Sequence, residues 1–195
     1  MKPRRIGILA LQGGVIEHLV ATREAARKLK IKCEIIEVRT KKDLKGLDGL
    51  IIPGGESTVL SKLLEAEGML AEMRKVRKIF GTCAGMILLA KKAEGRITGQ
   101  KTLGLMDIEI SRNAYGAQLE SFEEDIRTGL GRINAVFIRA PRVKGIGKGV
   151  KVLAKLGREP VAVYQHEAKG NRHYLACAFH PELSGTKFHE LFLLL

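Results

Sequence analysis

A cysteine stands between two glycines in the string Gly81-Thr82-Cys83-Ala84-Gly85. The apolar pair before it predicts a short strand at 79–80, and the residues from 84 to 92 predict a helix. A strand, a sharp turn with one exposed residue and a helix form the nucleophile elbow of G-x-S-x-G hydrolases, here with cysteine in place of serine. The N–H groups and dipole of a helix N-terminus favour a thiolate. The string therefore predicts a nucleophile, although a buried cysteine in a glycine-rich turn would look the same.

A thiolate nucleophile needs a general base, and the base needs a group that orients it. Near the C-terminus, the string Phe179-His180-Pro181-Glu182-Leu183 follows an apolar run that predicts a strand at 174–179. His180 is therefore expected at the carboxyl end of a strand, the edge where parallel sheets place their sites and where Cys83 also lies. Glu182 can accept a hydrogen bond from the imidazole and fix its tautomer. We predict a Cys83-His180-Glu182 triad, and expect surface or packing roles for His18, His166, His173 and His189.

The third chemical string is Pro53-Gly54-Gly55-Glu56-Ser57-Thr58, which follows an apolar run at 50–52. Two glycines let the backbone turn its N–H groups toward a neighbouring atom. Beside a cysteine nucleophile, the N–H groups of Gly55 and of Ala84 would form an oxyanion hole, the main stabilising element in acyl transfer. A loop with a helix N-cap at Ser57 or Thr58 explains the same string, and the two roles are compatible.

The elements that must position these residues alternate between strand and helix in the first half of the chain. Hydrophobic periodicity predicts strands at 6–11, 33–38, 50–52 and 79–80, and helices at 15–29, 58–73 and 84–92. After residue 100 it predicts strands at 106–110, 136–138, 150–156, 161–164 and 174–179, and a closing helix at 186–195. The glycine-rich run 144–149 lacks the strand and helix of a phosphate loop and predicts a surface turn. We expect one α/β domain over 1–195: a three-layer, mostly parallel sheet with helices on both faces and added antiparallel strands in the second half.

Composition limits the classes of partner. The chain has 195 residues, of which 45% are hydrophobic and 28% charged, which predicts a soluble globular domain and excludes a disordered chain. Its formal net charge of +13 suggests nucleic acid, a membrane surface or an acidic protein as a partner. The basic residues are dispersed, and with no Trp and three Tyr there are few stacking platforms, so we expect no nucleic acid. No run approaches the roughly 18 apolar residues that span a bilayer, so we expect no membrane insertion.

The cysteines and the N-terminus predict a cytoplasmic protein. Cys33, Cys83 and Cys177 are an odd, scattered set without a C-x-x-C pair, which favours reduced thiols with neither a disulfide nor a metal site. Cys33 and Cys177 fall in apolar runs and are expected in the core. The apolar run 6–11 is short and is followed by Gln-Gly-Gly, which is not typical of a signal peptide.

Together the three strings resemble the triad (class I) glutamine amidotransferases. Further strings make the chain similar to the glutaminase subunits of the ribose 5-phosphate-dependent pyridoxal 5′-phosphate synthases, over nearly its full length. These strings are Leu9-Ala10-Leu11-Gln12-Gly13, Glu17-His18, Arg112-Asn113-Ala114-Tyr115-Gly116, Gln118, Ser121-Phe122-Glu123 and Phe137-Ile138-Arg139-Ala140-Pro141. The chain departs from that pattern at Ala117, where the family usually has an arginine, so any contact made by that arginine is absent.

The resemblance implies a substrate, a reaction and a partner. L-glutamine would be hydrolysed to L-glutamate and ammonia through a thioester on Cys83. The ammonia would pass to a (β/α)8 synthase subunit, whose docking switches the glutaminase on, with Gln12 as a docking sensor. No metal or organic cofactor is implied, because pyridoxal 5′-phosphate is the product of the assembled complex. The residues implied in glutamine binding or the oxyanion hole are Gly54, Gly55, Glu56, Ser57, Ala84, Arg112, Ile138 and Arg139.

The residue types suit those binding roles. The planar donors of an arginine pair both oxygens of an α-carboxylate, and Glu56 would pair the α-ammonium. Two other classes remain open from the residues alone: a binding protein for nucleic acid or a scaffold, and a cysteine hydrolase or peptidase on the same elbow. If the chain is a glutaminase, we expect part of its positive charge to meet an acidic face of the synthase.

Overall fold

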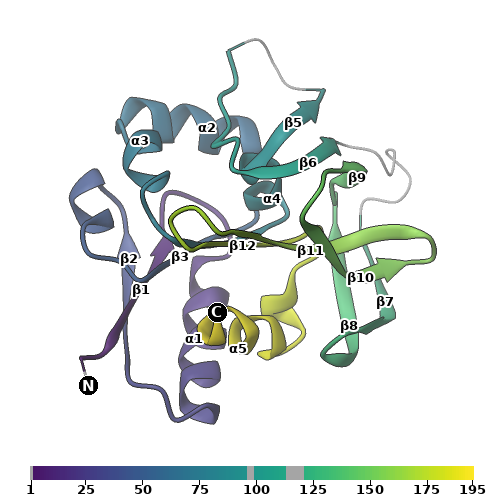
Figure 1. Ribbon diagram of the computed structural model, residues 1–195, viewed down its shortest axis with the longest axis horizontal. Helices are drawn as coiled ribbons and strands as arrows, with labels where there is room; N and C mark the ends of the chain where they lie inside the picture. Colours follow the sequence, from purple (N-terminus) through teal and green to yellow (C-terminus); the bar gives the residue numbers. More distant parts are fainter. Residues whose placement is uncertain (1, 96–98, 113–120) are drawn as a thin grey trace.

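The computed structural model describes residues 2–95, 99–112 and 121–195, and within them the strands form two sheets (Figure 1). The larger sheet has nine strands in the order β2-β1-β3-β4-β12-β11-β10-β7-β8. In chain order these are β1 (Arg4–Leu9), β2 (Cys33–Val38), β3 (Gly49–Ile52), β4 (Lys78–Thr82), β7 (Ser121–Thr128), β8 (Gly131–Ile138), β10 (Val150–Leu156), β11 (Glu159–Glu167) and β12 (Arg172–Cys177). The smaller sheet has three strands: β5 (Ala90–Glu94), β6 (Met106–Ser111) and β9 (Arg142–Ile146).

The helices cover both faces of the larger sheet. They are α1 (Val15–Lys28), α2 (Ser57–Ala66), α3 (Leu70–Met73), α4 (Ala84–Leu89) and α5 (Lys187–Leu194), with the short 3-10 turns η1 (Lys41–Leu44) and η2 (Pro181–Leu183). Figure 1 shows α1 and α5 together on one side of the central strands, and α2, α3 and α4 on the other. The central strands are buried on both sides, as Ile8, Ile51 and Phe80 show with no exposed surface. The predicted three-layer α/β class is confirmed.

Strand direction divides the larger sheet into two halves. The strands β2, β1, β3, β4 and β12 run parallel, and β11, β10, β7 and β8 continue the sheet with antiparallel pairing. The added antiparallel strands predicted for the second half are therefore present. One of them, β7, was not predicted, because its sequence Ser-Phe-Glu-Glu-Asp-Ile-Arg-Thr is mostly polar and Ile126 is its one fully buried residue.

Two predicted helices end early. The helix expected at 58–73 divides into α2 and α3, because Gly68 adopts a left-handed φ of 62° after α2 and the N–H of Met69 bonds back to the carbonyl of Leu64. The helix expected at 84–92 stops at Leu89. From Ala90 the chain is extended and pairs with β6 as β5, so that sheet pairing overrides the helical pattern of the sequence.

The glycine-rich run 144–149 was predicted as a surface turn, and this is wrong for its first half. Residues 144–146 belong to β9, which pairs with β6, and the turn is limited to the residues after it. The N–H of Gly147 donates to the carbonyl of Asp107 at 2.7 Å, which ties the turn to β6. The glycines hid this edge strand, since Val143 is its only buried apolar residue.

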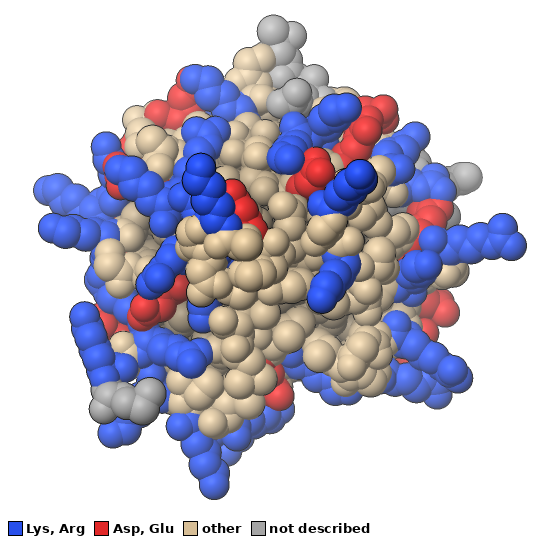
Figure 2. Space-filling model, viewed as in Figure 1, with Lys and Arg blue, Asp and Glu red and all other residues tan. Residues whose placement is uncertain are grey.

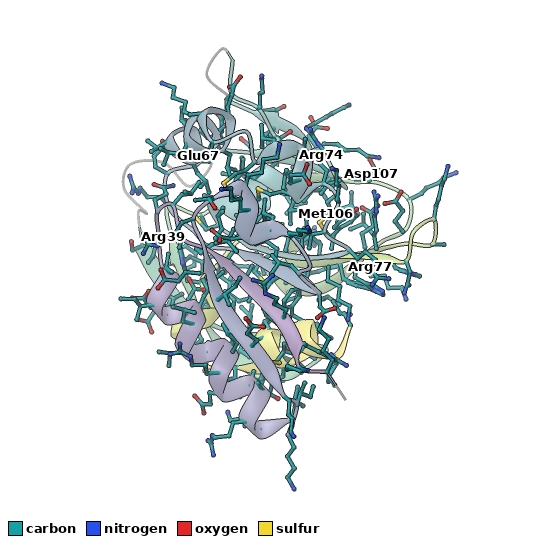
Figure 3. The ribbon with its side chains drawn as sticks, turned by 90° about the vertical axis from the view of Figure 1, so that its left-hand side faces the viewer. Arg39, Glu67, Arg74, Arg77, Met106 and Asp107 are labelled. Atoms are coloured by element: carbon teal, nitrogen blue, oxygen red, sulfur yellow. The ribbon has the colours of Figure 1, made fainter. Side chains whose placement is uncertain are left out.

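The segment that leads into β6 is held by Arg74, which follows α3. Its Nε donates to the carbonyl of Leu103 at 3.0 Å and its Nη2 to that of Thr102 at 2.9 Å. Figure 3 shows Arg74 on the same side of the molecule as Met106 and Asp107, the first residues of β6. These two hydrogen bonds fix the start of β6, and thereby the position of Arg112, which directly follows its last residue.

The three cysteines are free thiols, as predicted. Cys177 is fully buried in the core, whereas Cys33 is only half-buried at the start of β2. Over the described ranges, no helix combines the length and the apolar character needed to cross a membrane.

Gly81 and Gly85 let the chain fold back tightly around Cys83. A Cβ on Gly81 would lie 2.5 Å from the carbonyl of Gly85, and a Cβ on Gly85 would lie 2.2 Å from the carbonyl oxygen of Ile52. Both neighbours are backbone atoms that cannot rotate away. A side chain at Gly81 would therefore collide with α4, and one at Gly85 would collide with β3.

We expect Gly85→Ala to lower the free energy of unfolding by about 2 kcal/mol or more, because the added methyl group overpacks α4 against β3. Gly129→Ala is the matched control, since a Cβ there meets no atom within 4 Å, and its effect should stay within about 0.5 kcal/mol. Urea unfolding of both variants tests this. Equal stability of the two would contradict the close approach at the elbow.

Candidate active site

Cys83 occupies a strained turn between β4 and α4. Its φ of 49° and ψ of −105° are unusual for a residue with a side chain, and α4 begins at the next residue. Its N–H donates to the carbonyl of Cys177 at 2.8 Å, which fixes the turn against β12. The sequence predicted an exposed residue here, but only 6% of Cys83 is exposed, because its side chain lies within a cavity. The strand, turn and helix of a nucleophile elbow are all present.

His180 and Glu182 reach the same edge of the sheet from β12. Since β12 pairs in parallel with β4 and places Cys177 beside Thr82, both strands deliver the chain to one place. The N–H of His180 donates to the carbonyl of Val136 at 2.8 Å. The Nδ1 atom of His180 lies 2.8 Å from Oε1 of Glu182, whose side chain is only 1% exposed.

His180 and Glu182 each change the pKa of the other. Burial by itself lowers the pKa of His180, but hydrogen bonds and charge interactions with Cys83 and Glu182 outweigh it and raise this pKa to about 10. Burial likewise raises the pKa of Glu182, but hydrogen bonds from His18 and His180 hold it well below its usual range. At neutral pH the pair is therefore an imidazolium beside a carboxylate.

Gly54 makes room for the cysteine and the histidine to meet. A Cβ on Gly54 would stand 2.4 Å from Cε1 of His180 and 3.1 Å from Cβ of Cys83. Any side chain here would separate the two reactive groups. The first glycine of the Gly-Gly pair is therefore needed for space, whereas the second, Gly55, is needed for its φ of 147°.

Gln12 joins the turn after β1 to the loop that follows β3. Its Nε2 donates to the carbonyl of Glu56 at 2.7 Å. Gly13 and Gly54 approach so closely that a Cβ on Gly13 would lie 1.8 Å from the carbonyl oxygen of Gly54. Gln12 is thus in direct contact with the loop that carries Gly55, the position from which a docking sensor would act.

Glu56 caps α2, a role that the alternative explanation of this string gave to Ser57 or Thr58. Its carboxylate accepts from the N–H of Thr58 at 2.9 Å and of Val59 at 2.7 Å. That alternative does not hold, although Ser and Thr are the commoner caps, because here they form the first turn of the helix. Burial raises the pKa of Glu56, but these two N–H groups, with Arg112, bring it below its ordinary value.

Arg112 ties the end of β6 to this cap. Its Nη2 lies 3.1 Å from Oε1 of Glu56, and its Nη1 donates to Oε1 of Gln100 at 2.7 Å. Gln100 in turn donates to Oγ of Ser57 at 3.3 Å. Gln100 was not among the predicted site residues, because its position before β6 carries no chemical pattern of its own. The predicted pattern around Asn113, Tyr115 and Ala117 lies outside the described residues.

These side chains surround one cavity of about 310 Å³. Its lining contains eight of the predicted site residues: Gly55, Glu56, Ser57, Cys83, Arg112, Ile138, Arg139 and His180. It also contains Ile87, which was not predicted. The other predicted residues stand directly behind this lining, with Gly54 between His180 and Cys83, Glu182 bonded to His180, and Ala84 next to Cys83 at the start of α4. Ala84 lies in the first turn of α4, where N–H groups have no partner inside the helix.

The cavity combines a cysteine, a base and charges of both signs. Arg112 and Arg139 supply positive charge, and Glu56 supplies a carboxylate. The Sγ atom of Cys83 lies 3.8 Å from the carbonyl oxygen of Ile138. Such a site can attack an acyl carbon with a thiolate while holding a small zwitterion. Among the described residues, no group of three His, Cys, Asp or Glu side chains is arranged to hold a metal ion.

The prediction of a packing role for His18 and His189 was incomplete. Both are fully buried, and His18 Nε2 lies 3.3 Å from Oε2 of Glu182. His18 Nδ1 lies 2.9 Å from Nε2 of His189. Periodicity places both residues on apolar helix faces, but it does not show that the two faces meet behind the site.

A parallel sheet with this strand order and a cysteine elbow at its carboxyl edge defines the class I glutamine amidotransferase fold. The family model of the SNO glutamine amidotransferase family matches residues 8–194. The chain therefore belongs to this family of glutamine amidotransferases.

Individual relatives agree with this assignment. The chain is 46% identical, over 97% of its length and 96% of the relative's, to the pyridoxal 5′-phosphate synthase subunit PdxT of Korarchaeum cryptofilum. It is 44% identical to the PdxT subunit of Oenococcus oeni, over 97% of this chain and 95% of the relative. A crystal structure of a glutamine amidotransferase superposes with a TM-score of 0.82 at 46% identity, covering 97% of each chain. The crystal structure of a protein from Thermoplasma acidophilum, described as one subunit of a GMP synthase, shares the fold with a TM-score of 0.61 at 18% identity, covering 100% and 92%.

The histidine behind the site generates a stability prediction. Burial, with His18 alongside, lowers the pKa of His189 to about 3. In an unfolded chain the pKa of a histidine is about 6.5. Below that pH the unfolded state therefore binds a proton that the folded state does not. The stability present above about 6.5 is lost as the pH falls toward 3, at up to about 1.4 kcal/mol per pH unit.

We therefore expect His189→Phe to flatten the fall in unfolding free energy between pH 6.5 and 5. Urea unfolding at a series of pH values measures this slope. Glu182 and His180 do not mask it, because the contribution of Glu182 is lost only below about pH 4.5 and that of His180 only as pH rises toward about 10. His166→Gln, on the exposed side of β11, is the surface control. An unchanged slope in His189→Phe would show that His189 is not the group responsible.

Proposed function

We propose that the chain hydrolyses L-glutamine to L-glutamate and ammonia through a thioester on Cys83, and delivers the ammonia to a synthase subunit that makes pyridoxal 5′-phosphate. The observation that carries the proposal is the meeting of Cys83 and the His180–Glu182 pair at one cavity with Arg112, Arg139 and Glu56 in its lining. Membership of a glutamine amidotransferase family and the name of the PdxT relatives support the substrate and the pathway.

In the first half of the reaction, the Cys83 thiolate attacks the side-chain amide carbon of glutamine. The carbonyl oxygen becomes an oxyanion, and the N–H groups of Gly55 and Ala84 are placed to stabilise it. His180, as an imidazolium, donates its proton to the amide nitrogen, so that ammonia leaves and the γ-glutamyl thioester remains. Glu182 keeps the positive charge on His180 stable until the transfer.

In the second half, the neutral His180 takes a proton from water, and the resulting hydroxide attacks the thioester carbon. The bond from carbon to sulfur breaks, and Cys83 returns as a thiolate beside a protonated His180. The new γ-carboxylic acid gives its proton to water as glutamate leaves. Every proton is accounted for by the imidazole and by water. No cofactor takes part in this sequence; pyridoxal 5′-phosphate is the product made by the partner.

The polar half of the cavity suits the α-amino acid end of glutamine. Glu56 and Arg112 stand 3.1 Å apart as an ion pair, and a zwitterion inserted between them exchanges one ion pair for two. The α-carboxylate then pairs with Arg112 or Arg139, and the α-ammonium with Glu56. Ser57 and Ile138 complete the binding surface, and Gly54 supports it from behind the lining.

The partner is proposed to be a (β/α)8 synthase subunit, and its docking to act through Gln12. Because Gln12 bonds to the carbonyl of Glu56, a movement of the turn after β1 reaches the loop that carries Gly55. A nucleic-acid partner is less well supported. Figure 2 shows Lys and Arg scattered around the visible face, mostly toward its rim, with Asp and Glu between them and no single basic stripe.

Cys83→Ala should reduce glutamate release from glutamine by at least about 1,000-fold, because no other group supplies the nucleophile. The assay uses the chain together with the synthase subunit, and couples glutamate to a dehydrogenase. Cys33→Ala, which removes a thiol far from the cavity in sequence and in the sheet, is the matched control and should keep full activity. Wild-type activity in Cys83→Ala would rule out the thioester mechanism.

The charge of +13 leads to a second test of the partner. We expect the affinity of the chain for the synthase subunit to fall as the salt concentration rises from about 0.05 to 0.5 M, because surface charges are screened over about 10 Å or less at 0.1 M and above. Analytical ultracentrifugation or interferometry measures this. Affinity that does not change with salt would place the basic residues outside the interface.

A further inference from the structure

The second oxygen of the Glu182 carboxylate faces the N-terminal helix. Oε1 is engaged by His180 at 2.8 Å, and Oε2 lies 3.3 Å from Nε2 of His18 on α1. Among the described residues Oε2 makes no hydrogen bond of good geometry, and this close approach of His18 is its ion-pair contact. Since the side chains of Glu182 and His18 are 1% and 0% exposed, water does not substitute for this contact. One imidazole therefore stands at each end of the carboxylate.

Three neighbours fix the ring of His18. Its Nδ1 lies 2.9 Å from Nε2 of His189 on α5, and its Nε2 lies 3.1 Å from Oγ1 of Thr82, the last residue of β4. The ring of Phe80 meets it edge to face at a centroid distance of 6.2 Å. The residue that holds Glu182 is thus anchored to the strand that ends at Cys83.

The hydrogen bonds also assign the tautomer of His18. His189 is neutral, because burial and the neighbouring His18 lower its pKa to about 3, so it has one N–H. Its Nδ1 has no partner, so placing the proton on Nε2 leaves no buried N–H unpaired. That N–H donates to Nδ1 of His18, and the proton of His18 is then on Nε2, facing Glu182 and Thr82.

We propose that His18 is a positioning residue for the reaction, which holds the Glu182 carboxylate in the plane that orients His180 toward Cys83. This rests on the proposed glutaminase function. His18 does not line the cavity and touches no substrate. Without it, Oε2 is left buried and unpaired, so the carboxylate is free to rotate and is more easily protonated, and the imidazole loses its fixed orientation.

Other titratable groups around this contact enter the same pH profile. Glu182 lies in η2, His180 directly precedes η2, and His189 lies on α5. Cys177 is buried at the end of β12, and its pKa is raised by burial and by the nearby charge of Glu182. On α1 itself, Glu17 lies near Gly14, where an added Cβ would stand 3.4 Å from Oε2 of Glu17 and 3.5 Å from Oε1 of Glu182. The variants below leave all of these groups in place.

The test compares His18→Leu with His18→Gln in the full chain assembled with the synthase subunit. In His18→Leu we expect kcat for glutamine to fall about 10- to 100-fold, with KM changed less than about twofold. The basic limb of kcat/KM against pH should move down, because a loosened Glu182 raises the pKa of His180 less. His18→Gln keeps an N–H donor and should recover at least part of the kcat and of the pH profile.

Thr22→Val is the matched control for a purely structural effect. Thr22 is fully buried on α1 one turn after His18, and its hydroxyl donates to the carbonyl of His18 at 2.6 Å. Urea unfolding measures the stability of all the variants. Thr22→Val should lose stability but keep the wild-type pH profile. The proposal is overturned if His18→Leu keeps the wild-type kcat and pH profile, or if Thr22→Val shifts the profile equally. It is also overturned if His18→Gln is no better than His18→Leu.

A second measurement separates this proposal from the glutaminase function. Iodoacetamide labelling of Cys83 in the free chain, followed by peptide mass spectrometry, needs neither glutamine nor the synthase. We expect wild type and Thr22→Val to label fastest, His18→Gln next and His18→Leu slowest. If the wild type fails to hydrolyse glutamine, the proposed function is wrong, and this labelling order still decides the role of His18. If His18→Leu does not fold, His18→Gln and its pH profile carry the comparison.

Discussion

The structure depends on keeping one carboxylate ionised almost entirely out of water. Glu182 is 1% exposed, and an isolated buried carboxylate would take up a proton. Two imidazoles prevent this, one from each side of the group, and they come from parts of the chain that are far apart in sequence. The carboxylate therefore requires α1, β4, η2 and α5 to meet at one point. That meeting fixes the position of His180 beside Cys83.

Close backbone contacts are the second requirement of the site. Gly13 against Gly54, Gly81 against Gly85, and Gly85 against Ile52 each leave no space for a Cβ. These contacts bring the ends of β1, β3 and β4 nearer to one another than side chains would permit. The reactive groups converge because the sheet edge is packed through backbone, which deforms less than packed side chains do.

The sequence predicts the parts of the molecule whose signal is local. The strand, turn and helix around Cys83 and the parallel first half all follow from short patterns of apolar residues and glycine. It did not predict β7, whose residues are mostly polar although the strand lies between β10 and β8, or β5, whose extended form depends on pairing with β6. The alternative of a cap at Ser57 or Thr58 does not hold, because the longer side chain of Glu56 reaches the N–H groups of Thr58 and Val59. The contact of His18 with Glu182 is wholly tertiary, and no spacing along the chain encodes it.

The catalytic half of the cavity and its substrate-binding half are held in different ways, so a docking partner would not affect them equally. Cys83 and His180 are fixed by backbone hydrogen bonds to Cys177 and Val136, and so move only with the sheet. The substrate half depends on side chains that bridge loops: Gln12 to Glu56, Arg112 to Glu56 and Gln100, and Gln100 to Ser57. Individual bridges of this kind contribute about 1 kcal/mol each, so a partner that contacts the loops can rearrange them with ordinary interface energy. It follows that docking would act on the loop of Gly55 and on glutamine binding, while the nucleophile and its base stay in place.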